Sequence, residues 1–259
     1  MSTPITTELV KSLRDATGIS VMQCRKALEE AEGDKEKALA ILKKSSSDIA
    51  LKKADRDAKD GAINIKSKGD KTILVTLHCE TDFVSKNEDF LNLLNTLIDT
   101  ALEKGLEVMK ASAKELIDGV IQKTGEKIEL GTCYEIVGSV VNNYVHNNKM
   151  GVIVSLEGGN PEIARDVAMH IAAMKPEYIS PEEITEEAKK LMFEVFEKEV
   201  ASVDKPEEIK KKMLDGKIAT YFKEKTLLSQ PFIKNGDETV GQLLEKGKAK
   251  IKEVSRYAI

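Results

Sequence analysis

The histidines are the first residues to consider for metal or acid–base chemistry. The chain holds three, His78, His146 and His170, each on a different expected element. None has a second ligand at the HxxxH or HxxE spacing, which would place two metal-binding side chains on one face of a helix. The sequence therefore predicts no metal site and no cofactor.

The cysteines offer a second route to chemistry, through a thiolate nucleophile. The three, Cys24, Cys79 and Cys133, lie far apart and form neither a disulfide framework nor a CxxC metal site. Cys79 follows His78, but neighbours along a strand point to opposite faces and cannot form a nucleophile–base pair. His170 stays open as a distant partner for Cys79, beside the commoner role of a buried reduced thiol.

No acid–base pair or nucleotide-binding loop is evident. Glu80 and Asp82 are close in sequence, but no glycine-rich or aromatic pocket is expected around them. Neither GxxxxGK[ST] nor GxGxxG is present, and Gly158-Gly159 alone is a weak signal. The sequence thus predicts no catalytic residue and no enzyme activity.

One stretch, HCETDFVSKNEDF from His78 to Phe90, places an aromatic residue at the corner between two elements. The residues before it alternate in hydropathy as in a strand, and those after it recur at helical spacing. Ser85 and Glu88 match the S-x-x-E capping box, which predicts a helix that starts at Ser85. Phe83 then lies in the connection, where it either folds under into the core or stays exposed.

The first fifty or so residues predict three short helices separated by Gly18 and Gly33. This bundle resembles the ubiquitin-associated type of three-helix module, which binds partners. Residues 43–61 are rich in lysine, serine and aspartate and predict a hydrophilic helix or tether rather than core. Acidic residues offset its basic cluster, so a solvated face is favoured over an RNA-binding patch.

The middle of the chain groups strands with helices instead of alternating them. The expected strands are 62–66, 71–80, 127–135, 138–146 and 150–157, with a final one near 251–259. Helices are expected up to Gly125 and again from Pro161. This order predicts the α+β class, with antiparallel sheets in a core of two subdomains.

Residues 181–225 predict an inserted hairpin of two antiparallel helices, broken at Asp204-Lys205-Pro206. A second apolar stripe, made by Phe193, Phe196 and Val200, exceeds what one hairpin can bury against itself. A homodimer, another partner, and packing on the chain's own core are all open as its use.

The bulk composition excludes several partners. The formal net charge of the 259 residues is -4, from 40 basic and 44 acidic side chains, so the chain has no general attraction to nucleic acid or anionic membrane. No stretch approaches the roughly twenty apolar residues of a membrane span, and the first residues do not resemble a signal peptide. We expect a cytoplasmic protein that binds neither nucleic acid nor membrane directly.

Taken in this order, these elements resemble the elongation factor Ts family over essentially the full chain. The matching stretches are LVKSLRDATGISVMQCRKALEEAEGD, ETDFVSKNEDF, YVHNNKMGVIVSLEG, HIAAMKPEYISPEE and LLSQPFIKNGDETVGQLL. The resemblance implies a guanine nucleotide exchange factor of translation elongation, without enzymatic activity. It would bind elongation factor Tu in its GDP-bound and nucleotide-free states, displace Mg²⁺ and promote GDP release, so that GTP can bind. A ribosome- or RNA-associated binding module without exchange activity is the alternative.

The resemblance also implies roles for particular residues. The turn that enters the GTPase near its magnesium and phosphate sites corresponds to Thr81, Asp82, Phe83 and Val84, with Phe83 as a wedge. Further contacts are implied for Arg14, Met22, Arg25 and His146. Core packing is the alternative role for Met22, and a plain place at a strand end is the alternative for His146.

The resulting division of the chain has four parts. Residues 1–55 form the partner-binding module with its linker, and residues 56–140 form the N-terminal subdomain of the core. Residues 141–180 and 226–259 form the C-terminal subdomain. Residues 181–225 form the helical hairpin, which is the candidate for joining two copies of the chain.

Overall fold

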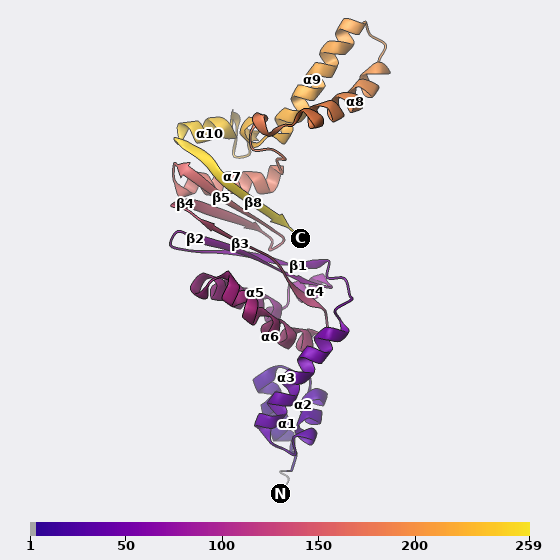
Figure 1. Cartoon of the computed structure of the whole chain (residues 1–259), viewed down its shortest axis with the longest axis vertical. Helices are drawn as coiled ribbons and strands as arrows, with labels where there is room; N and C mark the ends of the chain where they lie inside the picture. Colours follow the sequence, from indigo (N-terminus) through magenta and orange to yellow (C-terminus); the bar gives the residue numbers. More distant parts are fainter. Residues whose placement is uncertain (1–3) are drawn as a thin grey trace. The chain divides into compact units, whose positions relative to one another are not determined.

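The computed structural model describes residues 4–259 of the chain (Figure 1). The chain folds into two compact units. The first comprises the chain up to Ile136 with Asn147–Gly151 and Tyr257–Ile259, and the second comprises Val137–His146 and Val152–Arg256. The finer four-part division predicted from the sequence stays a prediction. The α+β class is confirmed, because helices cover small antiparallel sheets in both units.

The first unit begins with a bundle of α1 (Thr7–Thr17), α2 (Val21–Glu30) and α3 (Lys35–Lys52). Each helix starts at a side-chain cap: Thr6, Ser20 and Asp34 accept hydrogen bonds from backbone N–H groups of the first turn. Apolar side chains from the three helices form a core of their own, which includes Leu13, Cys24, Leu28, Ala38 and Leu42.

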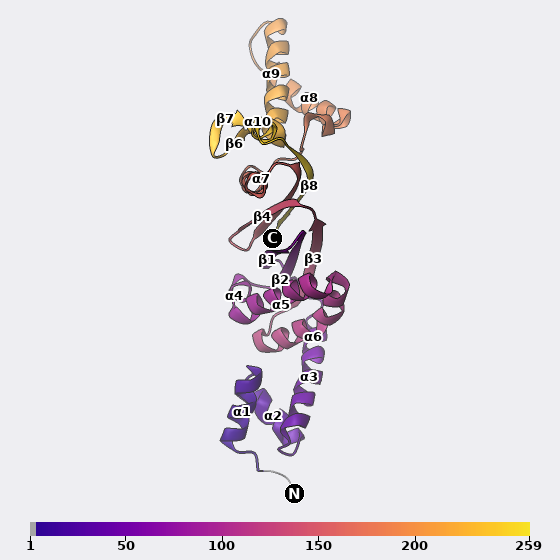
Figure 2. The same cartoon turned by 90° about the vertical axis from the view of Figure 1, so that its left-hand side faces the viewer.

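Helix α3 is longer than the sequence suggested, and its second half is not a tether. It continues past the bundle to α6 (Leu106–Thr124), as Figure 2 shows. Ser47 donates a hydrogen bond of 2.8 Å to Asp118, and Ile49 and Ala50 pack against the core beneath α6. Of the two predicted forms, helix or tether, the helix is present up to Lys52, and its contacts with α6 show that it is partly packed rather than fully solvated.

A three-stranded sheet with the order β1-β2-β3 is the framework of this unit. Its strands are β1 (Asp60–Lys68), β2 (Lys71–Cys79) and β3 (Ile128–Val137). The β1–β2 hairpin pairs Asp60 with Cys79 and Lys68 with Lys71. Helices α5 (Glu88–Lys104) and α6 cover one face of the sheet, and the aliphatic core lies between them (Figure 1).

The connection from β2 to α5 differs from the predicted one. A short helix, α4 (Asp82–Ser85), comes first, and α5 begins only at Glu88. The expected Ser85–Glu88 capping box is wrong, because Asn87 caps α5 by accepting a hydrogen bond from the Asp89 N–H at 2.8 Å.

The second unit is built on a sheet with the order β4-β5-β8. Its strands are β4 (Val140–His146), β5 (Met150–Gly158) and β8 (Ala249–Ala258). Helix α7 (Pro161–Met174) packs against β4, as Figure 2 shows, and α10 (Val240–Lys246) leads into β8. The chain also forms a hairpin of β6 (Pro231–Phe232) and β7 (Asn235–Thr239), which the sequence did not reveal because β6 is too short to show periodicity.

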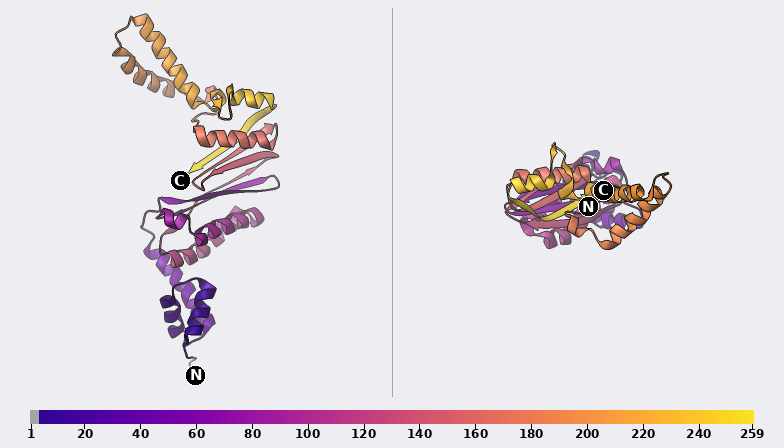
Figure 3. Two further views of the ribbon diagram at one scale, coloured as in Figure 1. Left: turned by 180° about the vertical axis from the view of Figure 1, so that it is seen from behind. Right: turned by 90° about the horizontal axis from the view of Figure 1, so that it is seen from above.

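Two antiparallel helices, α8 (Glu186–Ala201) and α9 (Glu207–Lys225), extend from this unit between the short 3₁₀ helices η1 (Pro181–Glu183) and η2 (Leu227–Ser229) (Figure 3). Part of the predicted second apolar stripe packs within the hairpin itself. Val200 is buried, and Phe196 packs edge-on against Tyr221, so for these two residues the structure shows packing within the chain, one of the uses left open by the sequence. Phe193 stays exposed, together with Leu191 and Val195. No helix among residues 4–259 is long and apolar enough to cross a bilayer.

Candidate binding site at the end of strand β2

Strand β2 ends at a turn whose backbone is held by hydrogen bonds. Thr81 is the N-cap of α4, and its hydroxyl lies 3.5 Å from the Val84 N–H. The Thr81 backbone N–H donates to one oxygen of Glu126 at 3.0 Å, and its hydroxyl donates to the other at 2.7 Å. The start of the TDFV sequence is therefore held by a carboxylate that follows α6.

Helix α4 divides its side chains between the interior and the solvent. Val84 packs against the core of the first unit, and Ser85 is buried. Phe83 is 84% exposed. The alternative in which Phe83 folds under into the core is thereby excluded. A phenyl ring held in water by an ordered turn is the kind of side chain that anchors an interface.

Asp82 lies beside Phe83 on the same exposed turn. Its carboxylate forms an ion pair of 2.7 Å with Lys86, and the exposed fractions of the two side chains are 53% and 71%. That hydrogen bond raises the pKa of Lys86 above its ordinary value. Because an exposed pair of this kind contributes little to stability, Asp82 can exchange Lys86 for another positive partner at small cost.

The other predicted contact residues of the first unit lie in the N-terminal bundle. Met22 is 80% exposed in the first turn of α2, beside the exposed Val21, so its alternative as a core residue is excluded. Arg14 lies in the last turn of α1, and Arg25 forms an exposed ion pair with Glu29 at 3.0 Å. These residues present apolar and basic groups to solvent, and their binding role stays a prediction.

His146 belongs to the second unit, at the end of β4. Its ring nitrogen Nδ1 lies 3.1 Å from the Tyr144 hydroxyl, within hydrogen-bonding distance. The side chain is exposed. This geometry is compatible with both a contact residue and a strand-end residue, so its role also stays a prediction.

The nucleophile alternative does not fit the surroundings of Cys79. Its buried S–H group donates to the Thr81 carbonyl at 3.2 Å, and burial, aided by the charges of Asp60 and Glu126, raises the pKa of the thiol to about 12. Such a thiol is essentially never ionised at neutral pH.

His170, the distant partner considered for Cys79, is committed elsewhere. Its Nδ1 accepts a hydrogen bond from the Ile233 N–H at 3.2 Å, so Nε2 carries the proton and donates to Gln230 at 2.9 Å. Burial lowers the pKa of His170 despite the bond to Gln230. Because both ring nitrogens of His170 already form hydrogen bonds, His170 cannot act as the base of a nucleophile–base pair with Cys79.

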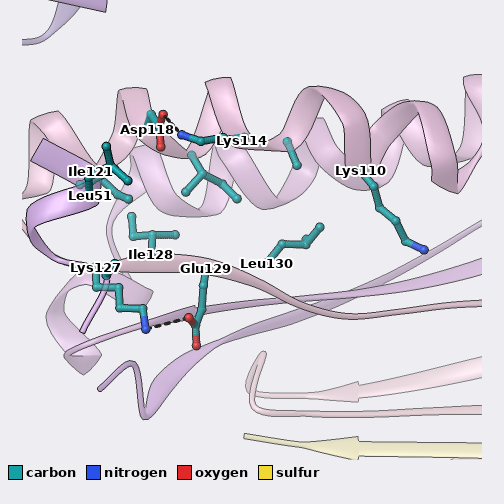
Figure 4. A pocket seen from close by; sticks show the side chains of 13 residues that line it. Leu51, Lys110, Lys114, Asp118, Ile121, Lys127, Ile128, Glu129 and Leu130 are labelled. Carbon is teal, nitrogen blue, oxygen red and sulfur yellow. Dashed lines mark hydrogen bonds and ion pairs between the residues drawn. The ribbon is translucent and has the colours of Figure 1, made fainter. Parts of the chain in front are cut away.

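A groove of about 450 Å³ lies where α3, α6 and β3 meet (Figure 4). Its floor is aliphatic. Four of its charged groups are paired within the groove, Lys114 with Asp118 and Lys127 with Glu129, and Lys110 pairs with Glu107 outside its lining. It contains no histidine or cysteine. Throughout residues 4–259, no group of three or more histidine, cysteine or carboxylate side chains is placed to hold a metal ion.

Sequence reasoning missed two residues of this region, Glu126 and Lys149. They contact Thr81 and Ser85 across 45 and 64 positions of the chain. No local spacing could have identified either one, because only the fold brings them to α4.

Comparisons with known proteins agree with the sequence resemblance. A family profile described as "Elongation factor TS" matches residues 80–259. The chain is 38% identical over 262 aligned residues to elongation factor Ts of Hahella chejuensis, covering 98% of this chain and 92% of the relative. It is 39% identical to that of Marinobacter nauticus, covering 93% and 86%, and 36% identical to that of an Escherichia coli strain, covering 98% and 91%.

Proposed function

The chain belongs to the elongation factor Ts family of translation elongation factors, and on that premise we propose that it releases GDP from elongation factor Tu. The observation that carries the proposal is the exposed Phe83 on an anchored turn of sequence TDFV. In the proposed complex this turn inserts beside the magnesium and phosphate sites of the GTPase.

The energetics of exchange need no catalytic residue. A protein that binds the nucleotide-free GTPase more tightly than the GDP-bound form must weaken GDP binding by the same factor, because the coupling free energy is reciprocal. A Mg²⁺ ion held by the GTPase is among the largest local charges at a phosphate site, so displacing it supplies a large part of that coupling.

In this proposal, Phe83 and Asp82 contribute to the displacement of Mg²⁺ in different ways. Phe83 occupies space between side chains of the GTPase and shifts the elements that position Mg²⁺. Asp82 brings negative charge and hydrogen-bond acceptors to the same place, once it leaves Lys86. Because α4 is anchored before binding, little conformational entropy is lost when the turn inserts.

The remaining predicted contacts extend the interface in this proposal. Arg14, Met22 and Arg25 bind the nucleotide domain of the GTPase, and His146 contacts it from the second unit. The buried Cys79 and the hydrogen-bonded His170 give no support to an enzyme, so in this proposal the protein acts by binding alone. Its proposed place of action is the cytoplasm.

The test is the release of a fluorescent GDP analogue from elongation factor Tu. A substoichiometric amount of this protein, added with excess unlabelled GDP, is expected to raise the release rate in proportion to its concentration. A release rate that equals the spontaneous rate at every concentration would refute the proposed exchange activity. Binding of the protein to ribosomes or RNA, without any acceleration of GDP release, would favour a ribosome- or RNA-associated module instead.

A further inference from the structure

Helix α4 cannot maintain its conformation by itself. It contains four residues, Asp82–Ser85, whereas isolated helices need about 12 to 15 residues to be even marginally stable in water. Only Val84 and Ser85 are directed inward, and Phe83 contributes almost nothing to folding because it is exposed. The orientation of Phe83 must therefore come from contacts at the two ends of the helix.

The first end is held by Glu126. Its two carboxylate oxygens accept the backbone N–H and the hydroxyl of Thr81, at 3.0 and 2.7 Å. Hydrogen bonds to an ionised group are roughly twice as strong as neutral ones. Glu126 directly follows Gly125, which ends α6 in the left-handed conformation with φ of 75°, so its backbone position is set by that helix.

The second end is held by Lys149. An ammonium group has three donors, and this one has three acceptors: Asp60 Oδ1 at 2.5 Å, the Gly61 carbonyl at 2.6 Å and Ser85 Oγ at 3.1 Å. The Ser85 hydroxyl in turn donates to the Asp82 carbonyl at 3.1 Å. Lys149 thereby connects the start of β1 to the backbone beside Phe83.

The backbone around Lys149 is itself fixed. The Ile63 N–H of β1 donates to the Asn148 carbonyl at 2.7 Å, and the Ile259 N–H donates to the Lys149 carbonyl at 2.9 Å. The side chain therefore extends toward α4 from a turn that is bonded on both sides.

We propose that Glu126 and Lys149 are positioning residues that preorganise α4, so that Phe83 is already in its binding orientation before the GTPase arrives. This inference rests on the proposed exchange function. Neither residue touches the GTPase in the proposed complex. Both act through α4, and their loss leaves Phe83 present but mobile, which weakens an interface because the turn must then be ordered on binding.

The test uses variants that remove one anchor at a time. Lys149→Met removes the ammonium group but keeps an unbranched apolar stem, Lys149→Arg restores the positive charge, and Glu126→Gln removes the second acceptor for Thr81. Lys66→Met is the matched control, because Lys66 has the same exposed fraction as Lys149, 34%, and a single carboxylate partner, Asp99.

The first readout is amide hydrogen exchange, which does not depend on the proposed function. The Ser85 and Asn87 amides are bonded to the Thr81 and Val84 carbonyls, and the Gly105 amide at the far end of α5 serves as the reference. Lys149→Met and Glu126→Gln should each accelerate exchange at Ser85 and Asn87 roughly tenfold, the loss expected from one hydrogen bond to a charged group. Exchange at Gly105 should not change, and Lys149→Arg and Lys66→Met should behave like the parent.

The second readout is stimulated GDP release, which should fall roughly tenfold in the same two variants and recover in Lys149→Arg. Unchanged exchange at Ser85 and Asn87, or equal acceleration at Gly105, would overturn the positioning role. So would a loosened α4 with full activity in both variants. A parent chain that releases no GDP would refute the proposed function, whereas the hydrogen-exchange result would still decide whether the two residues order α4.

Discussion

Replacing Phe83 by alanine separates a wedge residue from a core residue. Full burial of a phenylalanine side chain is worth about 1.5–3 kcal/mol. With 84% of Phe83 exposed, its contacts within the chain contribute at most about 0.5 kcal/mol to folding. The free energy of unfolding of Phe83→Ala should therefore match that of the parent within that margin.

Binding to the GTPase should respond much more strongly to the same substitution. If the exposed part of the ring becomes buried at the interface, its loss costs about 2 kcal/mol, which corresponds to roughly thirtyfold weaker binding. Titration calorimetry with nucleotide-free elongation factor Tu measures this change, and stimulated GDP release should fall by a similar factor.

Two further variants serve as controls for Phe83→Ala. Phe90→Ala removes a fully buried ring of α5 and should cost about 3–5 kcal/mol of stability. Leu51→Ala removes an exposed apolar side chain, 68% accessible, away from α4. It should change neither the free energy of unfolding nor the stimulated release of GDP. A Phe83→Ala protein that unfolds as easily as Phe90→Ala, or that releases GDP as fast as the parent, would refute the reasoning.

The same geometry supports four further predictions. Asp82→Ala should weaken binding by less than about tenfold, since a rim carboxylate can be replaced by water; a larger loss in calorimetry than that of Phe83→Ala would contradict this order. Met22→Ala should weaken binding by about fivefold or more without lowering the melting temperature, because Met22 is exposed; a lower melting temperature would restore its core role. Paired substitutions Leu191→Glu and Phe193→Glu should convert a homodimer formed through the hairpin to a 28.6 kDa monomer in sedimentation, and an unchanged mass would exclude this interface. Because burial lowers the pKa of His170 below 6.5, the unfolded chain binds a proton there that the folded chain does not, so the free energy of unfolding should fall as pH decreases below about 6.5. His170→Asn should remove this part of the pH dependence. Identical profiles of unfolding free energy against pH for the variant and the parent would contradict the prediction.

The sequence was sufficient for the elements with strong periodicity. The alternation in β2 and the helical spacing in α5 specify both elements because each buries one continuous face. The class and the two helix-covered sheets follow from their order along the chain.

The connection between β2 and α5 could not be derived from local spacing. Ser85 and Asn87 are both good N-cap residues, and the S-x-x-E pattern favours Ser85. In the structure the Ser85 hydroxyl is buried and bonded to Lys149, which is 64 positions away. This tertiary contact leaves the cap of α5 to Asn87, and Asp82–Ser85 form a separate helix, α4, capped by Thr81.

The exposure of Phe83 and Met22 was open for a related reason. Periodicity assigns a face to residues inside a long element, but both side chains lie in the first turn of a helix, where the neighbouring chain decides what covers them. In the helical hairpin, a residue predicted to be in surplus is packed within the chain. Phe196 of α8 packs against Tyr221 of α9, and the spacing of residues along α8 alone could not predict this contact.

In the proposed mechanism, binding of this chain and binding of GDP oppose each other on the same GTPase. The most direct test is the dissociation constant of the complex with elongation factor Tu, measured by calorimetry without nucleotide and again at saturating GDP and Mg²⁺. Reciprocal coupling predicts that GDP weakens the complex by the same factor by which the chain weakens GDP binding. Equal dissociation constants in the two conditions would contradict it.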